Sequence, residues 1–247
     1  GNIVWQKTFG GTGSDVSKNL IELSDGNILI IGNTNSKDND IPDFYGENDV
    51  FLIKVNPNGE KIWSNSYGGE RNDYGVFAIE IDENKIIIGA NSNSLAYNLN
   101  QNNGGTDCWI FQIDSQGQFE KGISFGGEKN DQINDMLFYN NEIYLVGYTE
   151  SEDWDGIDSK GGNDAIMVRL TSDLELIEVK NYGGSNHDEI KGIDILNLGS
   201  ITKDRILLTG NTKSFDLDFD TTSFEDWSKA FILSLKGSEI VWSEVFV

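Results

Sequence analysis

Aromatic and acidic residues gather in four loop segments, and together they have the chemistry of a ligand-binding surface. The segments run from about 35 to 48, 93 to 106, 150 to 163 and 213 to 228. Aromatic rings can stack on sugar rings while carboxylates and amides bond to hydroxyl groups, and the same combination suits a protein contact. The alternative is that the rings turn inward and cover the core. The residues expected to make contacts are Trp154, Tyr97, Tyr45, Trp227, Asp153 and Asp155.

One of these segments has part of the spacing of a calcium-binding loop. In "DLDFDTTSFEDW" the aspartates Asp216, Asp218 and Asp220 stand at alternate positions, as in an EF-hand. Thr221 replaces the required turn glycine, and Trp227 stands where the bidentate glutamate belongs. The EF-hand motif therefore fails. The three aspartates remain weak candidates for a less regular calcium site, and no other cofactor is expected.

The residues that usually carry catalysis are sparse in this sequence. His187 is the single histidine and lies near no nucleophile motif, and Cys108 lies in the apolar run "CWIF". A glycosidase needs only two suitably separated carboxylates, but so many acids are present that no pair can be chosen. The sequence favours a non-catalytic binding or protein-interaction module. The alternative is a glycoside hydrolase or lyase that uses carboxylates on the same surface.

A second set of residues recurs through the whole chain. Two adjacent glycines, with an aspartate five residues after the first, occur four times at spacings of 58, 58 and 57 residues. Glycine reaches positive φ without a Cβ penalty, and an aspartate can accept backbone N–H groups freed by a turn. Because a turn-holding group is needed at every turn, we interpret these residues as structural: Gly10, Gly11, Asp15; Gly68, Gly69, Asp73; Gly126, Gly127, Asp131; and Gly183, Gly184, Asp188. The alternative is a ring of carboxylates around a channel mouth.

Each copy is followed by the same series of short strand-like runs. The first repeat contains "VSKNLIEL", "NILIIGNT", "DVFLIKVN" and "KIWSNSY", which are rich in Val, Ile and Phe and bounded by Gly, Asn and Asp. The two middle runs are apolar at nearly every position, which indicates sheets covered on both faces. We predict an all-β fold, a β-propeller with four antiparallel strands per repeat. The single domain 1–247 would contain repeats at about 5–62, 63–120, 121–177 and 178–241, plus a terminal strand at 242–247.

The two ends of the chain carry the same kind of strand. "IVWQKTF" at 3–9 and "IVWSEVF" at 240–246 both read as the outer strand of a blade. The sequence therefore predicts four blades with one surplus outer strand. The glycine turns and the long loops should share one face, with the short "NPNG" and "DSQG" hairpins opposite, so the expected ligand face is the one with turns and loops.

The repeat pattern resembles a known family. A strand ending in Gly, then "NTNS" or "YTES", a Gly-x-x-Asp before an apolar strand, an "NPNG"-type turn and a closing aromatic-Gly-Gly are similar to bacterial surface-protein β-propeller repeats. The layout is also similar to kelch and WD repeats, without their signature dipeptides. The fourth repeat departs, because Lys229 occupies the place of Asp49, Asp107 and Asp164. The resemblance implies a secreted or cell-surface bacterial protein and no particular chemistry.

Composition limits the choice of partner. The 247 residues carry 18 basic and 41 acidic side chains, a formal net charge of -23. Such a charge repels phosphate backbones and anionic membranes, so nucleic acid is not expected as a partner. No apolar run reaches the roughly 20 residues of a membrane helix, so no membrane insertion of this chain is expected. A glycan or protein partner remains.

Overall fold

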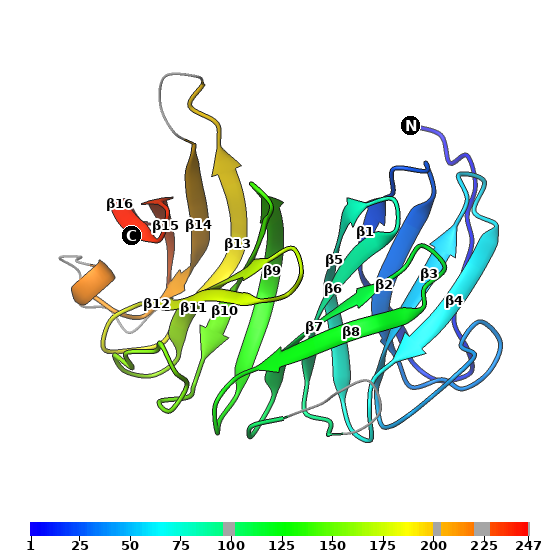
Figure 1. Cartoon of the computed structure of the whole chain (residues 1–247), viewed down its shortest axis with the longest axis horizontal. Helices are drawn as coiled ribbons and strands as arrows, with labels where there is room; N and C mark the ends of the chain where they lie inside the picture. The colour runs from blue at the N-terminus through cyan, green and yellow to red at the C-terminus, as the bar shows by residue number, and fades with distance from the viewer. Residues whose placement is uncertain (96–101, 200–203, 220–227, 247) are drawn as a thin grey trace. The chain divides into compact units, whose positions relative to one another are not determined.

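A computed structural model describes residues 1–95, 102–199, 204–219 and 228–246. The chain is all-β, with sixteen strands and one short 3-10 helix, η1 (Leu217–Phe219), in this part of the sequence. The strands form four four-stranded sheets, and within every sheet the strands are antiparallel and follow chain order (Figure 1). The chain divides into two compact units, 1–125 and 126–247, with two sheets each.

The first unit holds the sheets of the first two repeats. The first sheet consists of β1 (Asp15–Glu22), β2 (Ile28–Thr34), β3 (Asp49–Val55) and β4 (Lys61–Tyr67). The second consists of β5 (Asp73–Asp82), β6 (Lys85–Ser92), β7 (Asp107–Ile113) and β8 (Phe119–Phe125).

The second unit repeats this arrangement. Its first sheet consists of β9 (Asp131–Tyr139), β10 (Glu142–Thr149), β11 (Asp164–Thr171) and β12 (Leu176–Tyr182). Its second consists of β13 (Asp188–Leu196), β14 (Arg205–Thr212), β15 (Lys229–Lys236) and β16 (Glu239–Phe246). Every sheet thus begins at the aspartate of a glycine turn, and the predicted four strands per repeat are confirmed.

The first strand of every sheet carries an irregularity at the same place. The register shifts between Ser17 and Asn19 in β1 and between Gly75 and Phe77 in β5. The shift recurs in β9 opposite Gly147 of β10, and between Ile190 and Gly192 in β13. A bulge of one residue increases the local twist of a strand, so all four sheets share the same bend beside their first turn.

Apolar side chains of neighbouring sheets form the core of each unit. In the first unit, one cluster joins Leu29, Ile31 and Leu52 of the first sheet to Trp109 and Phe111 of the second. The Trp109 and Phe111 rings stack with centroids 4.3 Å apart. A corresponding cluster in the second unit includes Met167, Leu208 and Phe231. The middle strands of the second sheet, β6 and β7, are buried at nearly every position, as their continuous apolar sequence predicts, whereas β14 of the fourth sheet exposes Thr209 and Asn211.

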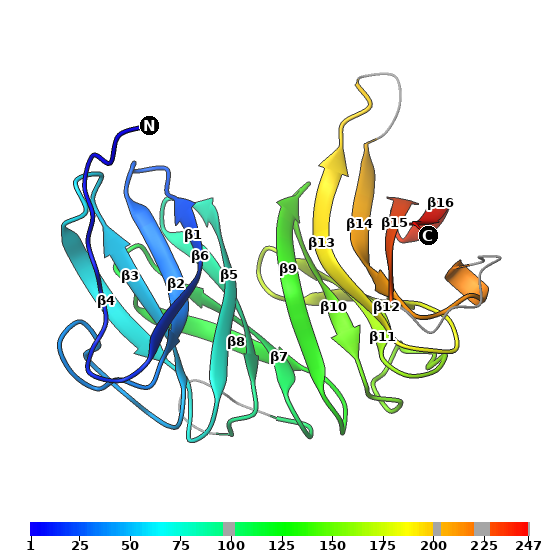
Figure 2. The same cartoon turned by 180° about the vertical axis from the view of Figure 1, so that it is seen from behind.

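The two chain ends differ in structure. β16 is the fourth strand of the fourth sheet, so the C-terminal copy of the outer-strand sequence completes that sheet. Residues 3–9 belong to no strand and run along the first sheet, so the N-terminal copy is the surplus one (Figure 2).

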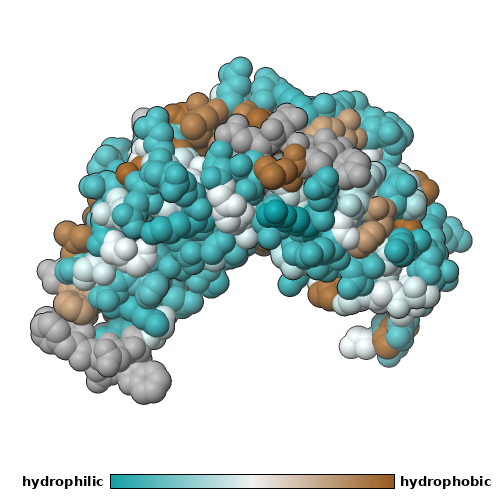
Figure 3. Space-filling model, turned by 90° about the horizontal axis from the view of Figure 1, so that it is seen from below, coloured by the Kyte–Doolittle hydropathy of each residue, from teal (hydrophilic) through white to brown (hydrophobic). Residues whose placement is uncertain are grey.

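The surface is largely polar. Hydrophilic residues cover most of the face seen in Figure 3, and the apolar residues there stand in separate patches. In the described part of the chain, no helix has the length and apolar character that crossing a membrane requires.

Candidate functional site

The aspartates of the glycine turns hold those turns together. Asp73 accepts hydrogen bonds from the Gly69 N–H at 2.7 Å, from the Ser94 hydroxyl at 2.8 Å and from the Ser92 hydroxyl. The same three bonds, from glycine N–H and two hydroxyls, surround the other three aspartates: Asp15, Asp131 and Asp188. Three of the four are fully buried and Asp15 is half-buried. This geometry supports the structural interpretation of the turn residues.

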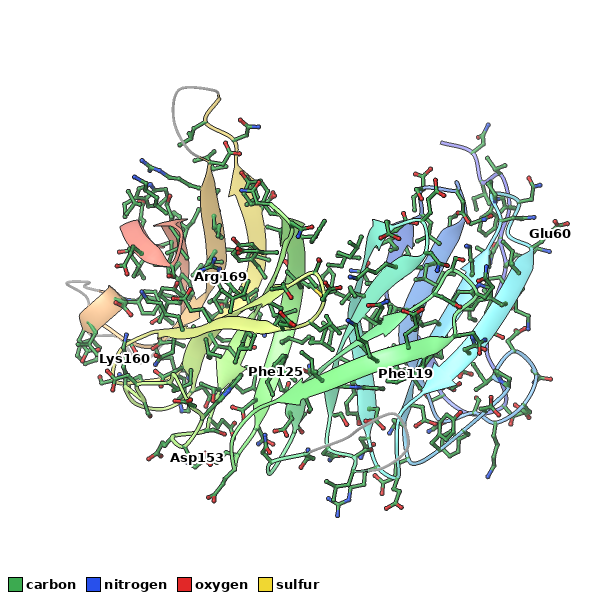
Figure 4. All side chains as sticks on the ribbon, viewed as in Figure 1. Glu60, Phe119, Phe125, Asp153, Lys160 and Arg169 are labelled. Carbon is green, nitrogen blue, oxygen red and sulfur yellow. The ribbon has the colours of Figure 1, made fainter. Side chains whose placement is uncertain are left out.

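Several acids of the long loops also serve the turns. The Asp38 carboxylate accepts from the Thr12 N–H at 2.8 Å, and Asp153 accepts from the Glu128 N–H at 3.0 Å. These bonds place loops and glycine turns on one side of each unit, as the sequence predicts. Asp155 is exposed on the same loop as Asp153, which is labelled in Figure 4.

The aspartates considered for a calcium site also accept hydrogen bonds from the glycine turns. Asp216 accepts from the Ser185 N–H at 2.8 Å, and Asp218 accepts from the Gly183 N–H at 3.0 Å. Lys160 forms a 2.7 Å ion pair with Asp218, and Figure 4 shows Lys160 beside η1. Asp220 lies outside the described residues. Within the described ranges, no three or more His, Cys, Asp or Glu side chains are grouped so as to hold a metal ion.

The aromatic candidates are less exposed than the sequence suggests. Trp154, one of the residues expected to make ligand contacts, is only 8% exposed. The acids beside it extend into solvent while the indole is buried, so it fits the alternative of a ring that covers the core. Tyr45 is half-buried, and its N–H donates to Asp49 at 2.7 Å. Tyr97 and Trp227 lie outside the described residues.

A different aromatic residue stands out on this side of the first unit. Tyr74, the second residue of β5, is 40% exposed, and its hydroxyl lies 3.2 Å from the Asn72 side-chain oxygen. The Asn48 amide donates to the same oxygen at 2.6 Å, and the Asn72 amide donates to Glu47 at 2.6 Å. We call Glu47, Asn48, Asn72 and Tyr74 the Tyr74 patch.

The backbone fixes the members of this patch relative to one another. Asn48 and Asn72 form an isolated parallel bridge between the segment before β3 and the turn before β5. The Asp73 N–H donates to the Asn48 carbonyl at 2.7 Å, and the Glu47 N–H donates to the Arg71 carbonyl at 2.9 Å. The patch therefore combines an exposed ring with preorganised amides and one carboxylate, which suits a ligand rich in hydroxyl groups.

The sequence does contain a signal for this bridge. An Asn-Asp pair occurs at 48–49 and again at 72–73, and in each pair the aspartate begins a strand. Local sequence does not show that the two pairs lie side by side, because they belong to different sheets.

The corresponding place in the second unit carries other residues. His187 Nδ1 lies 2.9 Å from the Asn163 side-chain oxygen, and Glu189 follows at the position that Tyr74 has in the first unit. His187 is thus part of a turn bridge, and the Tyr74 ring has no aromatic counterpart there. The other candidate for chemistry, Cys108, is fully buried in β7.

Two buried carboxyl groups lie directly beneath the Tyr74 patch. Asp49, the first residue of β3, is fully buried and its Oδ1 has no hydrogen-bond partner. Burial, followed by the negative charge of Asp73, raises the pKa of Asp49 to about 7. Burial also raises the pKa of Asp73 itself. Asp49 therefore carries a proton over much of the acidic pH range.

Comparison with known proteins identifies the fold. No family model matches the chain. The GH93 α-L-arabinofuranosidase of Fusarium graminearum, solved with arabinobiose, is 11% identical with a TM-score of 0.56, over 92% of this chain and 65% of that one. A levansucrase of B. megaterium is 13% identical with a TM-score of 0.42, over 94% and 68%. With four four-stranded sheets, the first likeness shows a four-bladed β-propeller fold.

One curated protein is related in sequence. Regulatory protein FlaEY of Caulobacter vibrioides is 24% identical over 212 residues, which cover 78% of this chain and 22% of the relative. The chain thus spans about a fifth of the length of FlaEY, and slightly less than two thirds of the arabinofuranosidase. The resemblance to bacterial surface-protein repeats stays a prediction, as does the location at the cell exterior.

Proposed function

We propose that this chain recognises a neutral carbohydrate through the Tyr74 patch on the turn side of the first unit. The single observation that carries the proposal is the exposed Tyr74 ring beside a fixed Glu47–Asn72–Asn48 network. A sugar can stack on the ring while its hydroxyls bond to the amides and to the exposed Glu47 carboxylate. The formal charge of -23 favours neutral over anionic sugars.

Binding without turnover is the function that the geometry supports best. Glycoside hydrolysis needs two carboxyl groups that flank the scissile bond. Glu47 is the one exposed carboxylate of the patch. Asp49 has a suitably raised pKa, but its unpaired oxygen faces Gly68 in the interior instead of the patch. Apart from the exposed Asp155 of the second unit, the other turn-side carboxylates described above accept hydrogen bonds from backbone N–H groups.

The binding test uses the intact chain and neutral oligosaccharides, beginning with arabinobiose because the similar arabinofuranosidase was solved with it. Titration calorimetry should detect a sugar whose affinity falls about tenfold in Tyr74→Ala and is kept in Tyr74→Phe. Trp242→Ala, which removes a similarly exposed ring elsewhere, serves as the matched control. Equal binding by Tyr74→Ala and the unaltered chain would exclude the patch.

A carbohydrate-active enzyme is the second candidate, and the comparisons favour it. The fold neighbour with the higher TM-score is an α-L-arabinofuranosidase, which is a glycoside hydrolase. The two candidates separate in one assay, in which the same oligosaccharides are incubated with the chain and scored for new reducing ends. Release of product that Glu47→Gln abolishes would establish catalysis at the patch. Binding without release would establish a binding module.

A further inference from the structure

Segment 45–48 carries half of the Tyr74 patch and is held by two buried aspartates. Its Tyr45 N–H donates to Asp49 at 2.7 Å, and its Asn48 carbonyl accepts from the Asp73 N–H at 2.7 Å. The other half of the patch lies directly beside Asp73, in the turn before β5 and in β5 itself. A change in the separation of the two aspartates therefore changes the separation of the two halves of the patch.

The two carboxyl groups share one buried place. Both residues are fully buried, and both carboxyl groups lie against Gly68. Asp73 accepts three hydrogen bonds there, whereas Asp49 Oδ1 has no partner. Two ionised carboxylates in such a place repel each other, and a buried charge without a partner is unfavourable. The arrangement in the structure therefore favours a neutral Asp49.

Few charged groups lie near Asp49. Burial and then the charge of Asp73, which faces it from β5, raise its pKa to about 7. Tyr67 of β4 directs its hydroxyl to the Gly117 carbonyl. The first unit contains no histidine, and in the described part of the chain no cation forms an ion pair with Asp49. The other titratable side chains of the adjoining segments are the half-buried Tyr45 and the exposed Glu47, Glu70, Arg71 and Tyr74.

The second unit contains the same pair with one difference. Asp164 and Asp188 lie against one glycine, and Lys160, four residues before Asp164, donates its N–H to that carboxylate at 3.0 Å. Burial raises the pKa of Asp164, but the charge of Lys160 opposes the rise. In the first unit Tyr45 stands four residues before Asp49. Asp49 therefore lacks the cation that stabilises the ionised form of its counterpart.

We propose that Asp49 is a positioning residue of the Tyr74 patch, which closes the patch when its carboxyl group is neutral and loosens it when that group is ionised. Ionised Asp49 is repelled by Asp73 and gains hydration if segment 45–48 moves outward, which separates Asn48 from Asn72. A sugar that contacts both halves binds the closed form, so its affinity should be lower at high pH. This consequence rests on the proposed carbohydrate recognition, whereas the movement does not.

Hydrogen exchange of the full chain tests the movement without any sugar. The Glu47 and Asp73 N–H groups donate to carbonyls across the junction of the two halves. The closed form binds the Asp49 proton more tightly than the open form, so the closed form loses stability as pH rises from about 4 to about 7. The protection factors of these two amides should therefore fall about tenfold or more between about pH 5 and pH 8. The Asn56 amide, in the hairpin at the other end of β3, should keep its protection factor.

Three variants identify the group responsible. Asp49→Asn keeps the shape of the side chain without ionising, and its protection factors should be equal at the two pH values. Tyr45→Lys supplies the cation found in the second unit and should make the fall smaller. Asp43→Asn, at an exposed position of the same loop, should show the full fall.

Two exchange results would overturn the proposal: equal protection of the unaltered chain at both pH values, or the same fall in Asp49→Asn. Arabinobiose titrations at the two pH values extend the test to the patch. Affinity should be lower at about pH 8 in the unaltered chain and equal at both pH values in Asp49→Asn. Equal affinity of the unaltered chain at both would also overturn the proposal. If arabinobiose binds at neither pH, carbohydrate recognition fails for this sugar, and the exchange data alone decide the role of Asp49.

Discussion

Asp49 and Asp73 direct their carboxyl groups at the same glycine. A Cβ atom added to Gly68 would lie 2.5 Å from Asp49 Oδ1 and 2.6 Å from Asp73 Oδ2. The second unit repeats the arrangement with Asp164 and Asp188 on either side of Gly183. Burial raises the pKa of Asp164, and the charge of Asp188 adds to the effect.

The first prediction follows from the direction in which the pKa of Asp49 is shifted. Its pKa of about 7 lies above the ordinary value of 3.8, so between these values the folded state binds more protons than the unfolded state. The Asp49 contribution to the free energy of unfolding therefore falls as pH rises from about 4 to about 7, and it is constant above that. Asp49→Asn removes the buried charge and should be more stable than the unaltered chain by about 2 to 3 kcal/mol near pH 8.

Urea denaturation at several pH values measures this difference. The advantage of Asp49→Asn should shrink as pH falls through 7 and vanish near pH 4. Glu47→Gln, a neutralisation at an exposed position two residues away, should show a much smaller pH dependence. An Asp49→Asn advantage that is equal at all pH values would mean that Asp49 is ionised throughout.

The second prediction concerns the turn aspartates. Asp73→Ala and Asp131→Ala each remove a carboxylate that accepts from a glycine N–H and two hydroxyls, and each should lower the free energy of unfolding by about 1 to 3 kcal/mol. Asp43→Ala, at an exposed loop position, should change it by less than about 0.5 kcal/mol. If Asp131→Ala unfolds like the Asp43→Ala control, the turn network has no structural role.

The third prediction tests the space between the carboxyl groups. Gly68→Ala forces a methyl group between Asp49 and Asp73 and should cost about 2 to 3 kcal/mol. Gly26→Ala is the control, because its Cβ would meet nothing within 4 Å and only its φ of +79° is unfavourable, at about 1 kcal/mol. Thermal melts of both variants should rank Gly68→Ala well below Gly26→Ala. The reverse order would contradict the close approach.

The fourth prediction compares Trp5 and Trp63, which are 58 residues apart and whose indole N–H groups donate to the corresponding carbonyls of Pro57 and Ser115. Trp63→Ala should cost about 2 kcal/mol, since it removes a half-buried ring and the bond to Ser115. Trp5→Ala should cost about 1 kcal/mol or less, because the ring is 39% exposed and its segment is in no strand. Chemical denaturation of the two variants measures which substitution lowers the free energy of unfolding more. Equal losses would show that segment 3–9 is as firmly held as β4.

The sequence predicts the framework of the fold well, because the framework depends on local patterns. Runs such as "DVFLIKV" specify strands, and the Gly-Gly and Asp spacing specifies the turns, so all four sheets could be located. The bulges in the first strands could not be predicted from the sequence, because the bulged residues are of different types, for example Lys18 in β1 and Asn134 in β9. A bulge depends on how two strands pair, which no single strand records.

The candidate site was much less predictable. Trp154 stands among acids in the sequence, yet the fold buries its ring, and Tyr74 lies inside a strand where a contact residue is not expected. Asn48 and Asn72 meet only because two sheets pack together. The unpaired oxygen of Asp49 likewise results from burial, which the residue type does not reveal.

The bonds from each outer strand to the next hairpin have a consequence for folding. The Tyr67 hydroxyl donates to the Gly117 carbonyl at 2.6 Å, and the Tyr182 hydroxyl donates to the Ser238 carbonyl at 2.9 Å. These contacts span 50 and 56 residues, so they form only after the adjoining repeat has been synthesised. A single sheet would leave the apolar face that packs on its neighbour exposed to water. The smallest cooperative folding unit is therefore a pair of repeats. Order should then spread along the chain by nearest-neighbour coupling, as it does in solenoid proteins.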